Sequence, residues 1–461
     1  MTATRTLQVH SPYTGELVGE APISSGADVS AALHAGAGSE ASKLSRHERS
    51  EILNGTAAAL AEQREELATL ISLESGLCLK DTRHEISRAV DVFRFAAIET
   101  LRDDGETFAG DITAHGGDRR AHTLRVPVRL VAAITPFNHP VNQVAHKLAP
   151  AIAAGAPIVV KPSEKTPLSA FRLRELIAQA GLPANAAQVV CGDPQEVLDA
   201  YLSHEGAEVI SFTGGVAVGK EIATRLGYRR AVLELGGNDP MIVLGDADLE
   251  EAARLAVRGA FANSGQRCTA VKRIIAVNSI ADELSERIAA GACALRLGDP
   301  LDKDTDIGTV IDERAASVII ERVHRAVAGG AQLLHGGDRE GALVQPTVLD
   351  HVPLDAELVA SETFGPVAPI IRVADLDEAI AVSNATRYAL SSSVCTFDWR
   401  AIARCIRELR AGTVNVREVP GWRTELTPFG GIGDSGLGVK EGVRDAIRAM
   451  SFTKLYTLPW S

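Results

Sequence analysis

EVISFTGGVAVGKEIATRLGYRRAVLEL, residues 208–235, is the stretch that decides the fold. It opens with an apolar run, passes through two glycines into an amphipathic helical pattern, and ends in a second apolar run. The same alternation reaches back to residue 156, where APIVV (156–160) and QVV (188–190) alternate with helical patterns at 168–180 and 194–202. Strands that alternate with helices predict a parallel, doubly wound α/β sheet that binds ligands at the carboxyl ends of its strands.

The flanking regions extend this organisation. After Gly236-Gly237 the strand-helix pattern restarts and runs to about residue 412, which predicts a second α/β domain. Residues 48–101 have helical periodicity, and we expect two helices that are broken near Ser75-Gly76. Residues 119–134 alternate polar and β-branched side chains and read as extended strands, as does MSFTKLYTLPW (450–460) at the end.

Composition narrows the class of partner. The chain has 461 residues and a formal charge of −12, without a long basic run, so we expect neither nucleic acid nor a membrane as partner. We find no secretory signal and no apolar run long enough to span a membrane, and the six cysteines lie far apart. These features favour reduced thiols in a cytoplasmic enzyme that binds a small molecule and needs no metal.

Cys268 is the candidate nucleophile. It lies in FANSGQRCTAVKRIIAV (261–277), between a helical pattern and an apolar strand, in a polar loop with Gly265, Arg267 and Thr269. An adjacent arginine can favour the thiolate, which is the reactive form. The alternative is a buried structural cysteine, because free thiols are commonly buried in cores.

Two further side chains follow apolar strands. Glu234 ends a strand in VLELGGNDP (232–240), where burial would raise the pKa of its carboxyl and suit it to activating water. Asn138 in AAITPFNHP (132–140) can donate to an oxyanion. Taken alone, Glu234 can equally be a salt-bridged strand end, and Asn138 can be a turn residue between two prolines.

Two strand-to-loop junctions can hold a dinucleotide. Gly214, Gly215 and Gly219 stand between a strand and a helix, where a diphosphate meets backbone donors, although the spacing is not GxGxxG. Lys161 and Glu164 follow another strand and can bind a ribose, or they can be ordinary solvated residues.

Seven segments, taken in order, resemble the signature blocks of the aldehyde dehydrogenase superfamily. They are ITPFNHP, VVKPSEKTP, SFTGGVAVGK, LELGGNDP, GQRCTA, ETFGPV and PFGGIGDSGLG, between Ile134 and Gly438. The resemblance implies an aldehyde dehydrogenase-like fold with two doubly wound parallel-sheet domains and a small β oligomerisation arm. We assign residues 1–118 and 139–234 to a discontinuous NAD(P)-binding domain, 235–430 to a catalytic domain, and 119–138 with 445–461 to the arm. The resemblance also implies a homodimer or homotetramer.

The resemblance implies roles residue by residue. Cys268 matches the nucleophile, Glu234 the general base, and Asn138, together with the backbone amide of Cys268, the oxyanion donor. The residues that match the cofactor contacts are Thr135, Pro136, Phe137, Lys161, Ser163, Glu164, Gly214, Gly215, Gly219, Leu235, Gly236, Glu362 and Phe364. Glu164 favours NAD over NADP, because a carboxylate near the 2′ position repels a phosphate.

The chain departs from the family pattern at two positions. Gly215 stands where many members have Ser, which removes one possible hydroxyl contact to the cofactor and bears on cofactor preference, and Gly433 stands where Lys is common, a change to which we assign no mechanistic role. Glu234 favours hydrolysis to the free acid, because relatives that transfer the acyl group to coenzyme A typically lack it. A protein that kept this fold without activity is the alternative from another class, and the intact Cys268, Glu234 and Asn138 argue against it.

Cationic side chains gather near the matched catalytic residues. The candidates for substrate binding are Arg88, His139, Arg267, Thr269 and Arg423. Guanidinium groups pair well with carboxylate, phosphonate or sulfonate oxygens, so we expect a small anionic aldehyde. FNHP, QRC and EVPGWR resemble phosphonoacetaldehyde dehydrogenases most. Phosphonoformaldehyde, sulfoacetaldehyde, succinate semialdehyde, glyceraldehyde 3-phosphate and lactaldehyde remain alternatives, and the arginines can instead form structural ion pairs.

Overall fold

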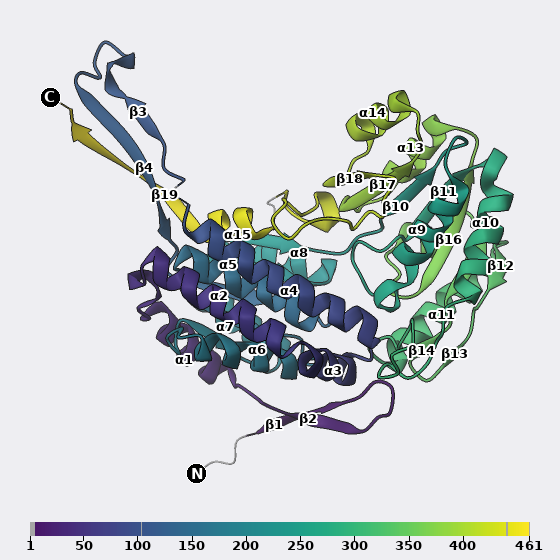
Figure 1. Ribbon diagram of the computed structural model, residues 1–461, viewed down its shortest axis with the longest axis horizontal. Helices are drawn as coiled ribbons and strands as arrows, with labels where there is room; N and C mark the ends of the chain where they lie inside the picture. Colours follow the sequence, from purple (N-terminus) through teal and green to yellow (C-terminus); the bar gives the residue numbers. More distant parts are fainter. Residues whose placement is uncertain (1–4, 103, 439–440, 461) are drawn as a thin grey trace.

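The computed structural model describes residues 5–102, 104–438 and 441–460. Two α/β units lie side by side, and a narrow three-stranded arm projects away from both at the upper left of Figure 1. This is the fold class that the sequence predicts.

The first unit is built on a sheet of five parallel strands in the order β7-β6-β5-β8-β9. Its strands are β5 (Val131–Ile134), β6 (Ile158–Lys161), β7 (Ala187–Val189), β8 (Val209–Thr213) and β9 (Arg230–Glu234). The first strand in sequence, β5, lies in the middle, so the winding changes direction between β5 and β8. Ligands bind at such a switch point, beyond the carboxyl ends of the strands.

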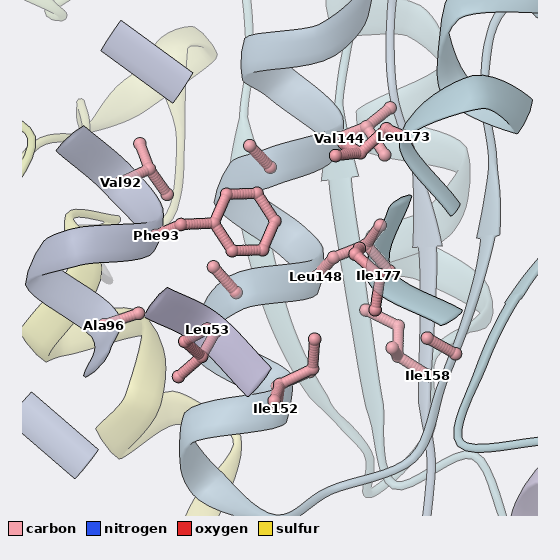
Figure 2. Close-up of a cluster of buried hydrophobic side chains, with 14 of the residues drawn as sticks. Leu53, Val92, Phe93, Ala96, Val144, Leu148, Ile152, Ile158, Leu173 and Ile177 are labelled. Atoms are coloured by element: carbon pink, nitrogen blue, oxygen red, sulfur yellow. The ribbon is translucent and has the colours of Figure 1, made fainter. Parts of the chain in front are cut away.

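Helices cover both faces of this sheet. One face carries α2 (Arg46–Glu62), α3 (Arg64–Ser75), α4 (Leu79–Thr100), α5 (Pro140–Ala154), α6 (Leu168–Gln179) and α15 (Val443–Ala449). The other carries α1 (Gly26–Ala37), α7 (Pro194–Ser203) and α8 (Val216–Arg225). Figure 2 shows the first core, in which Phe93 of α4 and Leu148 of α5 pack toward Ile158 of the sheet. The strands are apolar on both faces because both faces are covered.

The amino-terminal helical stretch contains three helices rather than the expected two. The break at Ser75-Gly76 is confirmed, and Gly76 ends α3 with φ 75°, a left-handed conformation that suits glycine. A second break falls at Gln63, which ends α2 and precedes α3. No glycine or proline marks that position, so the sequence pattern offers no signal for it.

The second unit holds a seven-stranded sheet in the order β12-β15-β16-β11-β10-β17-β18. Its strands are β10 (Pro240–Val243), β11 (Arg273–Val277), β12 (Gln332–His335), β15 (Thr347–Asp350), β16 (Val367–Val373), β17 (Ser391–Cys395) and β18 (Thr413–Val416). All pairs are parallel except the edge pair β12 and β15. The helices are α9 (Leu249–Phe261), α10 (Asn278–Cys293), α11 (Glu313–Ala328), α12 (Glu357–Ala360), α13 (Leu376–Asn384) and α14 (Trp399–Glu408).

The arm is an antiparallel sheet in the order β19-β4-β3. It consists of β3 (Thr107–Ala109), β4 (Arg119–Pro127) and β19 (Ser451–Pro459). Two small hairpins complete the fold: β1 (Thr6–His10) with β2 (Leu17–Pro22), and β13 (Arg339–Glu340) with β14 (Leu343–Val344).

The predicted arm boundaries need correction. Residues 131–134, which the sequence placed in the arm, form the central strand β5, and residues 107–109, which it placed in the first domain, belong to the arm. Helix α15 packs on α4 and α5, so the arm begins again only at Ser451. The reason is burial: VAAI at 131–134 is apolar at every position, as a central parallel strand requires, whereas β4 is only half-buried.

No helix in the described residues is both long and apolar enough to cross a membrane.

Candidate active site

The predicted site residues come together where the carboxyl ends of the five-stranded sheet meet loops of the second unit. Phe137, which follows β5, packs edge-to-face on Phe364 with ring centroids 5.9 Å apart. The Asn138 amide nitrogen donates to the carbonyl of Gln266 at 2.7 Å. Two loops that are far apart in the sequence therefore face each other across one small region.

The loop before Cys268 has an unusual backbone. Asn263, Ser264 and Gly265 have φ values of 61°, 52° and 68°, all left-handed, directly after α9. Neighbours hold this turn, since Asp81 of α4 accepts from the Asn263 backbone at 2.8 Å and the Asn263 side chain donates to the Asn138 carbonyl at 2.9 Å. Such strain is typical of functional sites, where the surroundings enforce it.

Glycines bring the loops into direct contact. A Cβ on Gly265 would overlap with the carbonyl of Gly365, and a Cβ on Gly237 would overlap with the carbonyl of Cys268. Because Gly237 lies three residues after Glu234, the segment that follows β9 touches the loop of Cys268 directly. Glu234 is 3% exposed and is bridged to Gly436.

The surroundings of Cys268 raise the pKa of its thiol to about 12. Burial is the main cause, and the carboxylates of Glu362, Asp239 and Glu234 add to it, while Arg423 opposes them. The effect of Arg267 on the thiol stays a prediction. Its guanidinium donates to the carbonyl of Gly259 at 2.7 Å, at the end of α9, and its charge also interacts with Cys268.

Asn138 is placed to donate to a second acceptor. Its amide is 4% exposed, and only one of its two N–H groups is needed for the bond to Gln266. Gln266 is itself fixed, because its side-chain oxygen accepts from the Ile311 backbone at 2.9 Å. The remaining Asn138 N–H can therefore serve as an oxyanion donor.

The predicted cofactor residues line the carboxyl ends of β5, β6, β8 and β9. The Thr135 backbone donates to the Lys161 carbonyl at 3.0 Å, and the Lys161 ammonium pairs with Glu164 at 3.0 Å. Burial opposes ionisation of Glu164, but Lys161, a backbone hydrogen bond and Lys165 together outweigh it and lower the pKa of the carboxyl. Ser163 accepts from the Lys165 backbone at 3.2 Å, and Pro136 lies half-buried between Thr135 and Phe137.

The α8 turn fits a diphosphate. Gly215 precedes the first turn of α8, and the space where its Cβ would stand has no atom within 4 Å. Gly214 precedes it, and Gly219 allows Leu235 to pack against the helix, since a Cβ there would overlap with that side chain. Free backbone donors at the start of a helix suit a phosphate group.

Glu362 faces the loop after the proposed base. A Cβ on Gly236 would overlap with the Glu362 carboxylate, which accepts from the Gly237 backbone at 3.2 Å. The pKa of Glu362 is raised by burial, against which Lys272 acts.

Sequence reasoning missed Lys272. Its ammonium donates at 2.7 Å to both the Gly265 and Thr363 carbonyls and lies 5.4 Å from the Phe364 ring. Burial lowers its pKa to about 8. Lys272 ties the loop before Cys268 to the loop of Glu362 and Phe364. The only feature of the sequence that could have identified it is its position four residues after Cys268.

The predicted substrate residues gather around another missed residue, Glu425. Its carboxylate, 4% exposed, accepts from Arg88 Nε at 2.5 Å and from His146 Nε2 at 2.6 Å, and it lies 3.9 Å from Arg423 Nη2. Burial opposes ionisation of this carboxyl, but Arg88, Arg423 and His146 hold its pKa well below the usual range. Arg423 also stacks on Phe429 at 4.0 Å.

The other predicted substrate residues border this group. His139 precedes α5 and has its Nδ1 3.7 Å from Glu85, which caps that helix by accepting from the Val141 and Asn142 backbones. Thr269 packs against Gly421, where a Cβ would overlap with its hydroxyl. Within the described residues, no group of three or more His, Cys, Asp or Glu could hold a metal ion.

Comparisons of the whole sequence with known proteins point to one family. The model of the aldehyde dehydrogenase family matches residues 1–456. A sulfoacetaldehyde dehydrogenase of Neptuniibacter caesariensis is 38% identical over 412 residues, covering 89% of this chain and 90% of the relative. A 3-sulfolactaldehyde dehydrogenase of Priestia aryabhattai is 36% identical over 457 residues, covering 99% and 96%.

The fold also matches that of a solved structure. The glyceraldehyde-3-phosphate dehydrogenase of Methanocaldococcus jannaschii in complex with NADP superposes with a TM-score of 0.95, at 36% identity over the full length of both chains. The chain described here belongs to the aldehyde dehydrogenase family and is an NAD(P)-dependent aldehyde dehydrogenase.

Proposed function

We propose that this enzyme oxidises a small anionic aldehyde to its carboxylate, with phosphonoacetaldehyde, giving phosphonoacetate, as the first candidate. The observation that carries the proposal is Arg423. Its guanidinium is nearly buried, and its Nη1 has no hydrogen-bond partner among the described residues. Its charge acts on Cys268. A buried donor without a partner costs free energy, and a substrate oxygen would satisfy it.

The chain's own groups support a covalent mechanism. The Cys268 thiol gives its proton to solvent, the thiolate sulfur attacks the aldehyde carbon, and the resulting oxyanion accepts from the free Asn138 N–H and from the backbone N–H of Cys268. The chemistry that bound NAD(P) would supply is a hydride acceptor, so that the thiohemiacetal carbon is oxidised to the level of a thioester. Glu234 then takes a proton from water as its oxygen attacks the thioester carbon. The Cys268–carbon bond breaks, and the acid leaves as a carboxylate.

Hydrolysis rather than transfer to coenzyme A follows from Glu234. It lies at the end of β9, and the backbone three residues later touches the Cys268 carbonyl, so a base is available beside the thioester. The same intact set of Cys268, Glu234 and Asn138 argues against an inactive structural protein.

The chain offers a fitting cofactor site. Lys161 and Glu164 would hold the adenosine ribose, the α8 turn the diphosphate, and Glu362 the nicotinamide ribose. Glu164 favours NAD, because a carboxylate repels a 2′-phosphate. Its ion pair with Lys161 at 3.0 Å offsets part of that repulsion, so NADP is an acceptable second cofactor.

Among anionic aldehydes, two classes have support. Three arginines (Arg88, Arg267 and Arg423) near the site favour a dianionic phosphonate, even with Glu425 among them. A sulfonated aldehyde is the second candidate, because two relatives are named for sulfoacetaldehyde and 3-sulfolactaldehyde. Phosphonoformaldehyde, succinate semialdehyde, glyceraldehyde 3-phosphate and lactaldehyde remain further alternatives.

The test compares initial rates of reduced-cofactor formation with phosphonoacetaldehyde, sulfoacetaldehyde and propanal, each with NAD and with NADP. We expect kcat/KM for phosphonoacetaldehyde to exceed that for propanal by at least a hundredfold. In R423A the KM for phosphonoacetaldehyde should rise at least tenfold and that for propanal less than threefold. R400A, which removes a charge from the exposed start of α14, is the control. Equal rates with propanal, or equal losses in R423A, would refute the anionic substrate.

We also propose a homodimer or homotetramer that works in the cytoplasm. The arm exposes apolar side chains on β19, including Leu455 (61%) and Leu458 (46%), which an assembly would cover. All six cysteines are free, as suits a reducing compartment.

A further inference from the structure

The buried carboxylate of Glu425 joins residues from three parts of the chain. It lies in the loop between β18 and α15, and it binds Arg88 of α4 and His146 of α5. Its backbone carbonyl accepts from Val443 at 3.0 Å, at the start of α15, so the carboxylate has a fixed base. A carboxylate with a fixed backbone can in turn fix the side chains that it binds.

The bonds of Glu425 decide which donors remain free on its partners. Arg88 uses its Nε for Glu425, which leaves the two terminal nitrogens of a planar, five-donor group. The Nη2 of Arg423 faces Glu425, and the plane of the guanidinium lies over the ring of Phe429. Its Nη1, which has no partner among the described residues, remains available to a ligand. His146 is buried, and burial, the largest effect, lowers the pKa of its imidazole, so it serves as a neutral donor to the second carboxylate oxygen.

Two guanidinium groups would repel each other without the carboxylate between them. The Arg88 side chain is 23% exposed and the Arg423 side chain 11%, so water screens this repulsion only weakly. Fixing such flexible side chains before binding reduces the entropy that the substrate must overcome.

We propose that Glu425 is a positioning residue of the substrate site: by holding Arg88 and Arg423 it directs their remaining N–H groups at the anionic end of the aldehyde. This inference rests on the proposed anionic substrate. It assigns Glu425 a role in specificity, not in the chemistry at Cys268. The opposite role, a counter-charge that merely weakens anion binding, predicts the opposite sign on mutation.

The experiment uses E425Q, which keeps the shape of the side chain and removes its charge. We expect the KM for phosphonoacetaldehyde, or for sulfoacetaldehyde if that is the better substrate, to rise at least tenfold. The kcat for the same aldehyde, and kcat/KM for propanal, should change less than threefold. E425D, which restores the charge on a shorter stem, should recover part of the loss.

E99Q is the matched control. The Glu99 side chain is 7% exposed, and its carboxylate accepts at 3.0 Å from both Nε and Nη2 of Arg444 in α15, so E99Q also removes one member of an ion pair with a largely buried carboxylate. Its loss should lower the melting temperature without changing the ratio of anionic to neutral aldehyde turnover. Calorimetric binding of phosphonoacetate to each variant gives a second readout and should weaken at least tenfold in E425Q alone.

Three results would overturn the inference. A lower KM for the anionic aldehyde in E425Q would make Glu425 a counter-charge. A parallel loss with propanal and the anionic aldehyde would make it structural, and no change at all would leave it without a role. If R423A discriminates between the two substrates while E425Q does not, only this inference fails. If neither does, the anionic substrate itself is wrong.

Discussion

At the scale of single residues, the thiol of Cys268 is held in its unreactive form. Burial and the nearby carboxylates of Glu362, Asp239 and Glu234 raise its pKa to about 12. Because the thiolate is the nucleophile, the protein without cofactor should react slowly with electrophiles at neutral pH. A nucleophile that stays protonated until the site is filled is protected from oxidation.

This gives a pH prediction for the cofactor-free protein. The thiolate fraction grows about tenfold for each pH unit below the pKa, so alkylation of Cys268 by iodoacetamide should accelerate from pH 7 to pH 10 without levelling off. Peptide mass spectrometry follows Cys268 separately from the exposed Cys293, which is an internal reference. A plateau below about pH 9 would show that the thiol is already activated in the empty site.

Sequence reasoning located side chains best where the backbone fixes them. Glu234 is the last residue of β9 and Asn138 lies four residues after the end of β5, so their places follow from strand ends that the apolar pattern reveals. It could not locate the guanidinium of Arg267, which donates to the end of α9. It also missed Glu425 and Lys272, because their importance lies in partners more than 80 residues away along the chain, such as Arg88 and Thr363.

At the scale of elements, three loops form one rigid unit around the sulfur. They are residues 234–237, 263–268 and 362–366, and they are held by Lys272, Glu362 and glycine contacts. The Lys272 contacts and the Gly265–Gly365 contact lie within the second unit, whereas the contacts of Gly236 and Gly237 are made by the segment that directly follows β9 of the first sheet. The position of Glu234 relative to the sulfur therefore depends on how that segment meets the other two loops.

G237A tests this coupling. The added methyl group would overlap with the Cys268 carbonyl, so the nucleophile loop must shift, and small displacements of reacting groups are costly. We expect kcat to fall about a hundredfold, with a smaller effect on the KM of the aldehyde. Stopped-flow formation of reduced cofactor measures the loss.

The control for this variant is G245A. Gly245 has no atom closer than 3.5 Å to the site of the new methyl group, so that variant should keep its activity and melting temperature. Activity within threefold of the unmodified enzyme in G237A would show that the loops are not rigidly coupled.

At the scale of the whole molecule, the arm has an edge strand, β19, whose outer side is unpaired in the described chain. Its strands β19 and β4 pair along their full length, from Ser451 opposite Pro127 to Pro459 opposite Arg119, while the far side of β19 is not paired in the described chain. Exposed edge strands with apolar side chains tend to associate. The arm is therefore the expected site of assembly.

L455E tests this expectation. Leu455 is 61% exposed on β19, and a charge buried in an interface is unfavourable. The variant should therefore dissociate from a dimer or tetramer into monomers. Sedimentation velocity measures the change. L354E, at a leucine that is 55% exposed outside the arm, should leave the assembly intact. Unchanged mass in L455E would place the interface elsewhere.

The sequence by itself determined the two doubly wound sheets, the break at Gly76 and the set of seven motif blocks, because apolar periodicity and glycines act locally and leave a readable pattern. Only the tertiary structure decided that residues 131–134 form the central strand rather than part of the arm, and that Arg267 donates to the end of α9. It alone brought Glu425 to Arg88 and Lys272 to Thr363. The physical reason is that burial and charge pairing depend on which distant segments meet, and a linear pattern does not record those meetings.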